Sequence, residues 1–179
     1  MNGSMLIELR KFVETRLGKQ AWPELVKAAA VPPRVYVPVT DYPDQEVHAL
    51  ISALSVRTGD SIPIILEAMG EFVVPDLIKM VPTLVRPDWR TVDVIANTEE
   101  MIHEVLRGAW KNTNPPKLHC LQSGSHEVTV TYTSSRKMCP LAKGIIRGIA
   151  KHYGEQVNIS EPSCMLRGDA ACQLLVTVI

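Results

Sequence analysis

Apolar residues recur at helical spacing through most of the first 110 residues of the chain. In the first such segment, Met5–Leu17, Ser4 is the expected N-terminal cap and Gly18 the expected end. The same pattern predicts further helices over Ala21–Ala30, from Asp44 to about Gly59, from Ser61 onward, and over Thr91–Trp110. Gly70 and Pro75 interrupt the helix that follows Ser61, so we expect a break or a second short helix over Val73–Met80.

The pattern changes near Asn112-Thr113-Asn114-Pro115-Pro116, where alternating apolar and polar residues begin. The expected strands are Lys117–Gln122, Glu127–Ser134, Gln156–Glu161 and Ala171–Val178. A helix over Met138–Tyr153 separates the second strand from the third. We therefore predict an α+β protein of one domain, with a mainly helical lobe over residues 1–111 and a lobe over residues 112–179 that holds a four-stranded antiparallel sheet and a helix.

Composition and charge narrow the classes of function. The 179 residues include 19 basic and 19 acidic side chains, so the formal net charge is zero and the sequence shows neither a nucleic-acid footprint nor a polybasic membrane patch. No apolar run has the length needed to span a bilayer, and the first residues lack the features of a signal peptide. We expect a cytoplasmic protein whose four cysteines are thiols or metal ligands rather than a disulfide framework.

Three polar residues at the end of the second strand form a candidate anion site. In an extended strand, Tyr132, Ser134 and Arg136 point to one face. A guanidinium offers a planar fork of donors to a carboxylate, and the two hydroxyls add further donors, so this face suits a dianionic ligand. The alternative is the polar solvent face of an edge strand.

His103 lies in the middle of the predicted helix Thr91–Trp110, on a face with Ala96, Leu106 and Trp110. A neutral imidazole on a largely apolar face is suited to be an axial iron ligand. The alternative is a core histidine hydrogen-bonded to a backbone carbonyl. The other histidines, which we expect to be surface or structural residues, are His48, His119, His126 and His152.

The order of His103, then Pro115-Pro116, then Tyr132-x-Ser134-x-Arg136 resembles the H-NOX family of haem nitric oxide/oxygen-binding domains, related to the sensor domain of soluble guanylate cyclase. The resemblance extends over the chain and includes Met1-x-Gly3, Trp22, Gly70-Glu71-Phe72 and Gly144. It implies a bacterial stand-alone member that buries haem b between its two lobes. It also implies that His103 ligates the iron, that Tyr132, Ser134 and Arg136 hold the propionates, and that Pro116 distorts the porphyrin.

The resemblance also bears on the gas and on the output. In oxygen-binding members a distal tyrosine, tryptophan and asparagine support bound oxygen, and the matching positions here are Leu141, Leu9 and Val73. None of them can donate a hydrogen bond, so we expect a sensor of nitric oxide that excludes oxygen. Binding of nitric oxide would release His103 and shift the lobes. The implied output partner is a separate histidine kinase or cyclic-di-GMP enzyme.

Three cysteines in the second lobe form a candidate zinc site. Cys139 begins a helix, whose dipole favours thiolate, while Cys164 and Cys172 bracket the turn at Gly168 and could face each other. Some bacterial relatives have such a site with a histidine as fourth ligand, and the residue at that place here is Glu161. The alternative is three buried or half-buried thiols, with or without one disulfide; Cys120 is expected to be structural. If zinc is bound, thiol oxidation could eject it and provide a redox input.

We find no motif typical of an enzyme: no nucleophile elbow, no phosphate-binding glycine loop and no HExxH arrangement. The nearest acid–base group, Glu99, Glu100 and Glu104, is expected to be a solvated helix face. The leading interpretation is thus a haem-dependent sensor without catalysis of its own, and the competing one is a haem-independent thiol or zinc redox sensor on the same fold.

Overall fold

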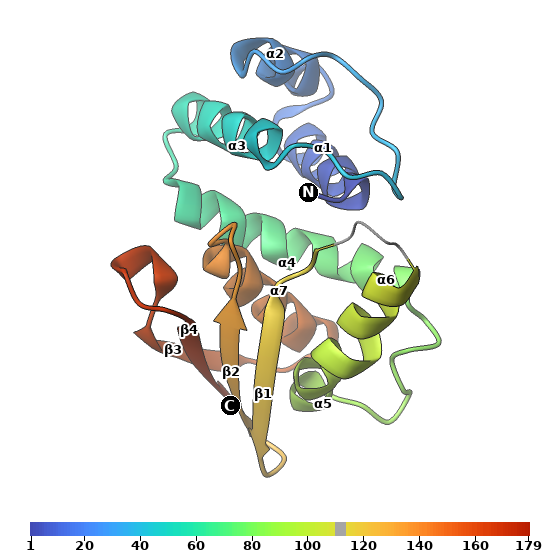
Figure 1. Ribbon diagram of the computed structural model, residues 1–179, viewed down its shortest axis with the longest axis vertical. Helices are drawn as coiled ribbons and strands as arrows, with labels where there is room; N and C mark the ends of the chain where they lie inside the picture. The colour runs from blue at the N-terminus through green and yellow to red at the C-terminus, as the bar shows by residue number, and fades with distance from the viewer. Residues whose placement is uncertain (110–113) are drawn as a thin grey trace.

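The computed structural model describes residues 1–109 and 114–179 and has two layers (Figure 1). The first layer contains α1 (Gly3–Leu17), α2 (Ala21–Ala28) and α3 (Asp44–Thr58), and it lies across α4 (Ile62–Met80). After α4 come α5 (Thr91–Asn97), a π-helical segment (Thr98–His103) and α6 (Glu104–Ala109). The sheet layer then contains β1 (Lys117–Ser123), β2 (Glu127–Thr133), α7 (Cys139–His152), β3 (Val157–Ser163), a short 3-10 helix (Met165–Arg167) and β4 (Cys172–Val178).

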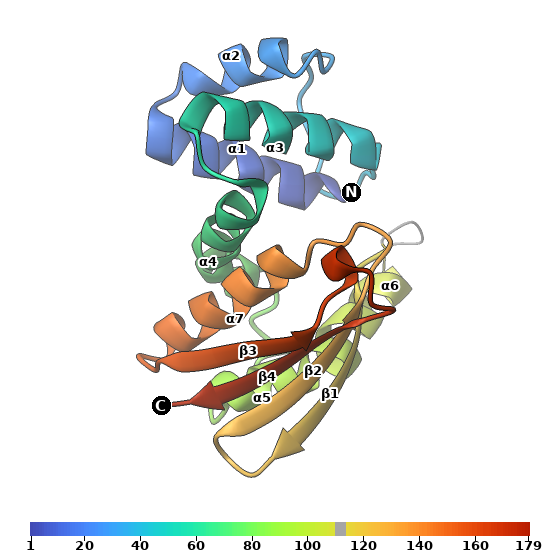
Figure 2. The same ribbon diagram turned by 90° about the vertical axis from the view of Figure 1, so that its left-hand side faces the viewer.

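The four strands form one antiparallel sheet in the order β1-β2-β4-β3. Its buried face carries Val128 and Val130 from β2 and Leu174 and Val176 from β4. Side chains of α5, α7 and the end of α4 cover this face, and Figure 2 shows α7 and α5 beside the sheet. The predicted α+β class and four-stranded antiparallel sheet are confirmed.

The first helix begins two residues earlier than predicted, and its cap is different. The side chain of Asn2 accepts a hydrogen bond from the backbone N–H of Ser4 (3.0 Å), so Asn2 rather than Ser4 is the N-cap. The helix therefore includes Gly3, which lies directly against the carbonyl of Val37, where a Cβ would be only 2.0 Å from that oxygen. This close approach holds the segment between α2 and α3 against the start of α1.

The predicted break in the fourth helix is wrong, because α4 runs without interruption from Ile62 to Met80. Pro75 removes only the hydrogen bond that its N–H would donate to the carbonyl four residues earlier. The neighbouring side chains compensate through burial: Val73 and Val74 are 0% and 1% exposed. Tertiary packing has thus overridden the local preference.

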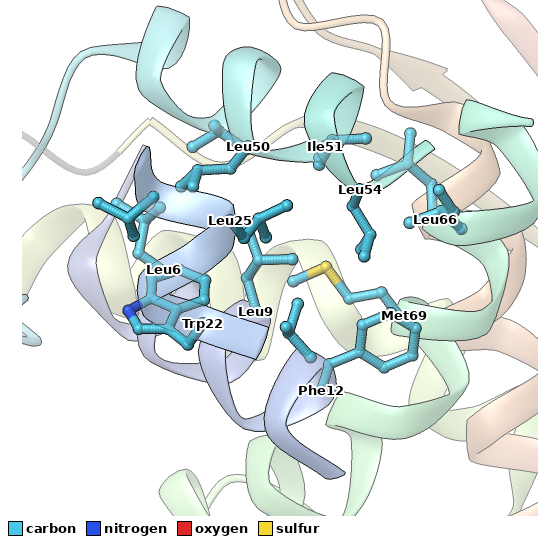
Figure 3. Close-up of a cluster of buried hydrophobic side chains, with 14 of the residues drawn as sticks. Leu6, Leu9, Phe12, Trp22, Leu25, Leu50, Ile51, Leu54, Leu66 and Met69 are labelled. Atoms are coloured by element: carbon cyan, nitrogen blue, oxygen red, sulfur yellow. The ribbon is translucent and has the colours of Figure 1, made fainter. Parts of the chain in front are cut away.

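Two hydrophobic cores meet at α4. Val73 belongs to the first, which α1, α2 and α3 share with α4 and which Figure 3 shows in close-up. Val74 belongs to the second, between α4, α5, α7 and the sheet. One helix therefore connects the two layers, and a shift of α4 would disturb both cores.

Within the described residues, the structure has no helix long and apolar enough to cross a membrane.

Candidate functional site: a histidine and an arginine joined by the segment before β1

The long helix predicted over Thr91–Trp110 is divided by π-helical geometry, and His103 is the last residue of the π-helical segment. Such segments are rare and occur frequently at functional sites. The side chain of His103 is 14% exposed and its ring Nδ1 lies 3.0 Å from Oε2 of Glu99. Of the residues expected on the same face, Trp110 lies outside the described residues, as does the side chain of Leu106.

Glu99 turns toward the protein, which corrects the expectation of a solvated face. Its Oε1 accepts a hydrogen bond from Arg107, and its Oε2 accepts one from the backbone N–H of Leu118 (3.1 Å). Glu100 and Glu104 are exposed, as predicted. The π-helical turn explains the difference, because it rotates the positions before His103 relative to an ordinary α-helix.

Burial and hydrogen bonding set the charges of this pair. Burial would raise the pKa of Glu99, but hydrogen bonds from Arg107, His103 and Leu118 outweigh it, and the pKa lies below its ordinary value. For His103 burial has the larger effect and lowers the pKa, although Glu99 acts in the opposite direction. At neutral pH the arrangement is therefore an ionised carboxylate beside a neutral imidazole, which keeps a lone pair for a metal.

The Tyr-x-Ser-x-Arg residues do not lie on one strand as predicted. β2 ends at Thr133, and Ser134 and Arg136 lie in the turn that leads to α7. The Ser134 hydroxyl accepts a hydrogen bond from the backbone N–H of Arg136 (3.2 Å) and also contacts the buried phenol of Tyr132. Burial raises the pKa of Tyr132, while hydrogen bonds with Ser134 and the Met138 backbone oppose this. The turn still brings the three residues together.

Arg136 joins both layers. Its Nε donates to Oδ1 of Asp44 at the start of α3 (2.8 Å), and the same oxygen accepts a hydrogen bond from the amino group of Met1 (2.7 Å). Burial would raise the pKa of Asp44, but these two cations lower it. The Arg136 side chain is 13% exposed, and its Nη1 donates to the carbonyl of Asn114.

The segment Asn114–Pro116 connects the histidine and the arginine. Arg136 donates to the Asn114 carbonyl, and the Pro116 carbonyl lies close enough to the His103 ring to raise its pKa. Residues 33 positions apart in the sequence thus contact the same three-residue segment. Pro116 itself is half-buried at this junction.

The three predicted distal residues, Leu9, Val73 and Leu141, lie in apolar surroundings. Leu9 and Val73 are 1% and 0% exposed, and Leu141 packs on the same core. Leu9 and Leu141 line a small cavity of about 10 Å³, together with Met5, Met69 and others. Neither Val73 nor His103 is part of its lining. A cavity of this size holds about one water molecule.

A second candidate site lies where β2, β4 and α7 meet. Sγ of Cys164 is 3.6 Å from Sγ of Cys139 and 4.0 Å from Sγ of Cys172, and all three cysteines are buried free thiols. Ligand atoms of these cysteines and of Glu161 all lie within 4.8 Å of one another. Sulfurs around tetrahedral zinc are roughly 3.8 Å apart when the bonds are about 2.3 Å long. The predicted proximity of Cys164 and Cys172 across their turn is confirmed.

Glu161 is suited to be the fourth ligand. Its Oε1 is buried and has no hydrogen-bond partner among the described residues, while Oε2 lies 3.2 Å from Nζ of Lys143. The helix dipole was expected to favour a thiolate at Cys139, but the surroundings of this thiol act in the opposite direction. Burial and the neighbouring thiols raise the pKa of Cys139, because a thiolate there would be desolvated and close to two further sulfurs.

The remaining candidates are peripheral. His48, His119, His126 and His152 are exposed, as predicted. Cys120 is half-buried beside the sheet core, and burial raises its pKa to about 11, so it is a weakly reactive thiol.

Comparison with solved structures defines the class of protein. The chain has the fold of H-NOX proteins. The crystal structure of an H-NOX protein from S. oneidensis in the Fe(II)NO state matches with a TM-score of 0.93, 23% identity and coverage of 100% of this chain and 99% of that one. The Fe(II) unliganded H-NOX protein from K. algicida matches with a TM-score of 0.88 and 20% identity, over 100% of this chain and 97% of that one. A mutant H-NOX from T. Tengcongensis matches with a TM-score of 0.83 and 23% identity, over 99% of this chain and 96% of that one.

The sequence then identifies the family. The model of the Haem-NO-binding family (HNOB) matches residues 2–161, so the chain belongs to this family. A search of the curated proteins finds no match. Members of the family bind haem, respond to gases such as nitric oxide and signal to partner proteins.

The residues present suit a haem. A neutral imidazole on His103 can ligate iron, and the largely buried guanidinium of Arg136 can pair with a propionate. Two participants were missed from the sequence: Glu99 and Asp44. The spacing of Glu99 and His103, four residues apart on a predicted helix, was a usable signal for the first. Asp44 is 92 residues from Arg136, and no local pattern relates them.

Proposed function

We propose that the chain is a nitric oxide sensor that binds haem b, with His103 as the axial iron ligand. Tyr132, Ser134 and Arg136 would hold the propionates, and Pro116 would press on the porphyrin. We also propose that residues 1–179 form a single H-NOX domain, with a helical lobe over 1–111 and a sheet lobe over 112–179. The haem iron, when bound, supplies the position at which a diatomic gas coordinates.

One observation carries this proposal: the His103 ring and the Arg136 guanidinium both lie at the segment Asn114–Pro116, where Arg136 donates to the Asn114 carbonyl and the Pro116 carbonyl raises the pKa of His103. A ligand that needs both a nitrogen donor for its metal and a cation for its carboxylate would find them close together here. An unrelated core histidine would not require a nearby, largely buried arginine. Of the two interpretations of His103, the geometry therefore favours the iron ligand.

The selectivity for nitric oxide over oxygen follows from the apolar distal residues. Bound oxygen carries partial negative charge and gains from a hydrogen-bond donor, whereas nitric oxide needs one much less. Leu9, Val73 and Leu141 have no donor, and they pack against other apolar side chains.

Signalling would begin at the π-helical segment. A bound haem iron would hold the His103 ring from a second side, in addition to the contact of Nδ1 with Glu99, and loss of that bond would leave the Glu99 contact. The segment Thr98–His103 and α6 are then free to move relative to the layer of α1–α3. We propose a histidine kinase or a cyclic-di-GMP enzyme as the separate partner. We place this in the cytoplasm, where the free thiols of the chain persist.

The test is the absorption spectrum of the reduced protein, with and without nitric oxide, under air and under argon. We expect a haem band that responds to nitric oxide, with the shift of a five-coordinate complex, and that is unchanged by air. A band that shifts reversibly in air would refute the selectivity. A preparation that takes up no haem on reconstitution would refute the whole proposal.

A pair of variants tests the axial ligand. His103→Ala should change the ferrous spectrum, and added imidazole should restore it. His48→Ala, which alters an exposed histidine on α3, is the matched control and should leave the spectrum unchanged. If the two variants give the same ferrous spectrum as the wild type, His103 is not the ligand.

The cysteine cluster supports a second function, a zinc or thiol redox input on the same chain. The four candidate ligands lie within 4.8 Å, and the buried Oε1 of Glu161 has no partner among the described residues. Zinc would satisfy this oxygen and stabilise thiolates that are otherwise desolvated. Oxidation of two of the cysteines to a disulfide would remove two ligands and release the metal.

This second function is tested by metal content and by titration with a chromogenic zinc chelator. We expect about one zinc per chain and its release on mild oxidation. If purified protein holds no zinc and does not compete with the chelator for it, the cluster is a set of buried thiols.

A further inference from the structure

We propose that Glu99 is the positioning residue of the axial histidine: its Oε2 accepts the Nδ1–H hydrogen bond of His103 and thereby sets how strongly the opposite ring nitrogen donates to iron. The inference rests on the proposed function of His103 as the iron ligand. It concerns a residue that neither the Tyr-x-Ser-x-Arg motif nor the apolar face of His103 indicates.

The geometry holds Glu99 in one place. Three donors converge on its carboxylate from three parts of the chain: the His103 ring at 3.0 Å, the Leu118 backbone at 3.1 Å and the Arg107 guanidinium. The Leu118 donor belongs to β1 and is fixed by the sheet. The side chain of Glu99 is only 19% exposed, so water competes little for these bonds. A carboxylate on the solvent face of the helix would not accept a hydrogen bond from the backbone of β1.

The Glu99 bond determines the tautomer of His103. A carboxylate accepts hydrogen bonds, so Nδ1 carries the proton and Nε2 carries the lone pair that can bind a metal. An anionic acceptor draws this proton toward itself and raises the electron density on the ring. The expected consequences are a stronger iron–histidine bond and preferential stabilisation of ferric over ferrous iron.

Arg107 moderates the effect. It is bonded to the other oxygen of the same carboxylate, so part of the Glu99 charge is compensated. Removing Glu99 and removing Arg107 should therefore have opposite effects on iron. This opposition distinguishes an electronic role from a structural one, because loss of packing would change both variants in the same sense.

The experiment uses the haem-loaded full chain and measures the reduction potential and the iron–histidine stretching frequency by resonance Raman spectroscopy. Glu99→Gln keeps the size and an acceptor oxygen but removes the charge. We expect a roughly tenfold shift of the ferric–ferrous equilibrium toward ferrous iron, which for one electron is a rise of about 59 mV, and a lower stretching frequency. Glu100→Gln makes the same chemical change at the exposed neighbouring position and should shift neither quantity comparably.

Arg107→Gln provides a second measurement that remains decisive if Glu99→Gln does not fold. We expect its reduction potential to fall and its stretching frequency to rise. Equal shifts in the Glu99 and Glu100 variants, or shifts of the same sign in the Glu99 and Arg107 variants, would overturn the inference. If His103→Ala leaves the wild-type ferrous spectrum unchanged, the proposed function itself fails, whatever the other variants show.

Discussion

The crossing of α4 and α7 gives the most quantitative prediction. Gly144 on α7 lies so close to α4 that a Cβ would be 2.0 Å from the carbonyl oxygen of Glu67, about 1.4 Å short of the 3.4 Å at which ordinary contact begins. The nearest atoms all belong to the Glu67 backbone, so no flexible side chain can move aside. In Gly144→Ala the two helices must separate, and both cores that meet at α4 lose contact.

The magnitude follows from two opposing terms. Overpacking of a well-packed core costs about 1–3 kcal/mol, and backbone contact places this site at the upper end. Alanine is favoured over glycine in a helix by about 1 kcal/mol, which offsets part of that cost. We therefore expect the free energy of unfolding to fall by about 2 kcal/mol, and Tm by about 4–8 °C for a chain of this size.

The assay is thermal and urea unfolding followed by circular dichroism. The matched control is Gly108→Ala on α6, where a Cβ meets no atom of the described residues within 4 Å. This variant should be as stable as the wild type or slightly more stable, because only the helix preference changes. If Gly144→Ala unfolds at the wild-type temperature, the helices do not cross as closely as described, and the reasoning is refuted.

Three further predictions concern charge and metal. Asp44→Asn should destabilise the chain by only about 1 kcal/mol, since the Asp44 side chain is 36% exposed. Because the pKa of Asp44 is lowered, the difference in unfolding free energy from wild type should shrink in urea titrations as pH falls below 3.8. Burial lowers the pKa of His103, so this histidine takes up its proton at a higher pH in the unfolded chain than in the folded one. The stability of the protein without haem should therefore decrease as pH falls below 6.5. A His103→Ala variant that shows the same decrease in thermal melts would contradict this. Cys164→Ser should weaken zinc binding by roughly tenfold or more in a chelator competition, whereas Cys120→Ser, outside the cluster, should not; equal losses in both would point away from the cluster.

Periodicity alone was sufficient for most of the fold, because a helix or strand that buries one face must show it in its sequence. The strands and most helices lie within about two residues of their predicted positions. The failures occurred where a distant contact outweighed a local signal. Pro75 indicated a break in α4, but the helix is held from both sides by the two cores.

The candidate sites show the same division between what the sequence predicts and what requires the structure. His103, the Tyr-x-Ser-x-Arg residues and the cysteines could be selected from residue type and spacing, because the reactivity of a side chain belongs to its atoms. Their surroundings could not be derived from the sequence. Whether Glu99 faces water or the His103 ring depends on a π-helical turn, and whether Cys139 is a thiolate depends on how deeply it and its neighbouring sulfurs are buried. Arg136 meets Asp44, 92 residues away, only after the layers pack together. The sequence determined which groups are available, and the tertiary structure decided their partners and charge states, since these depend on distance and burial in three dimensions.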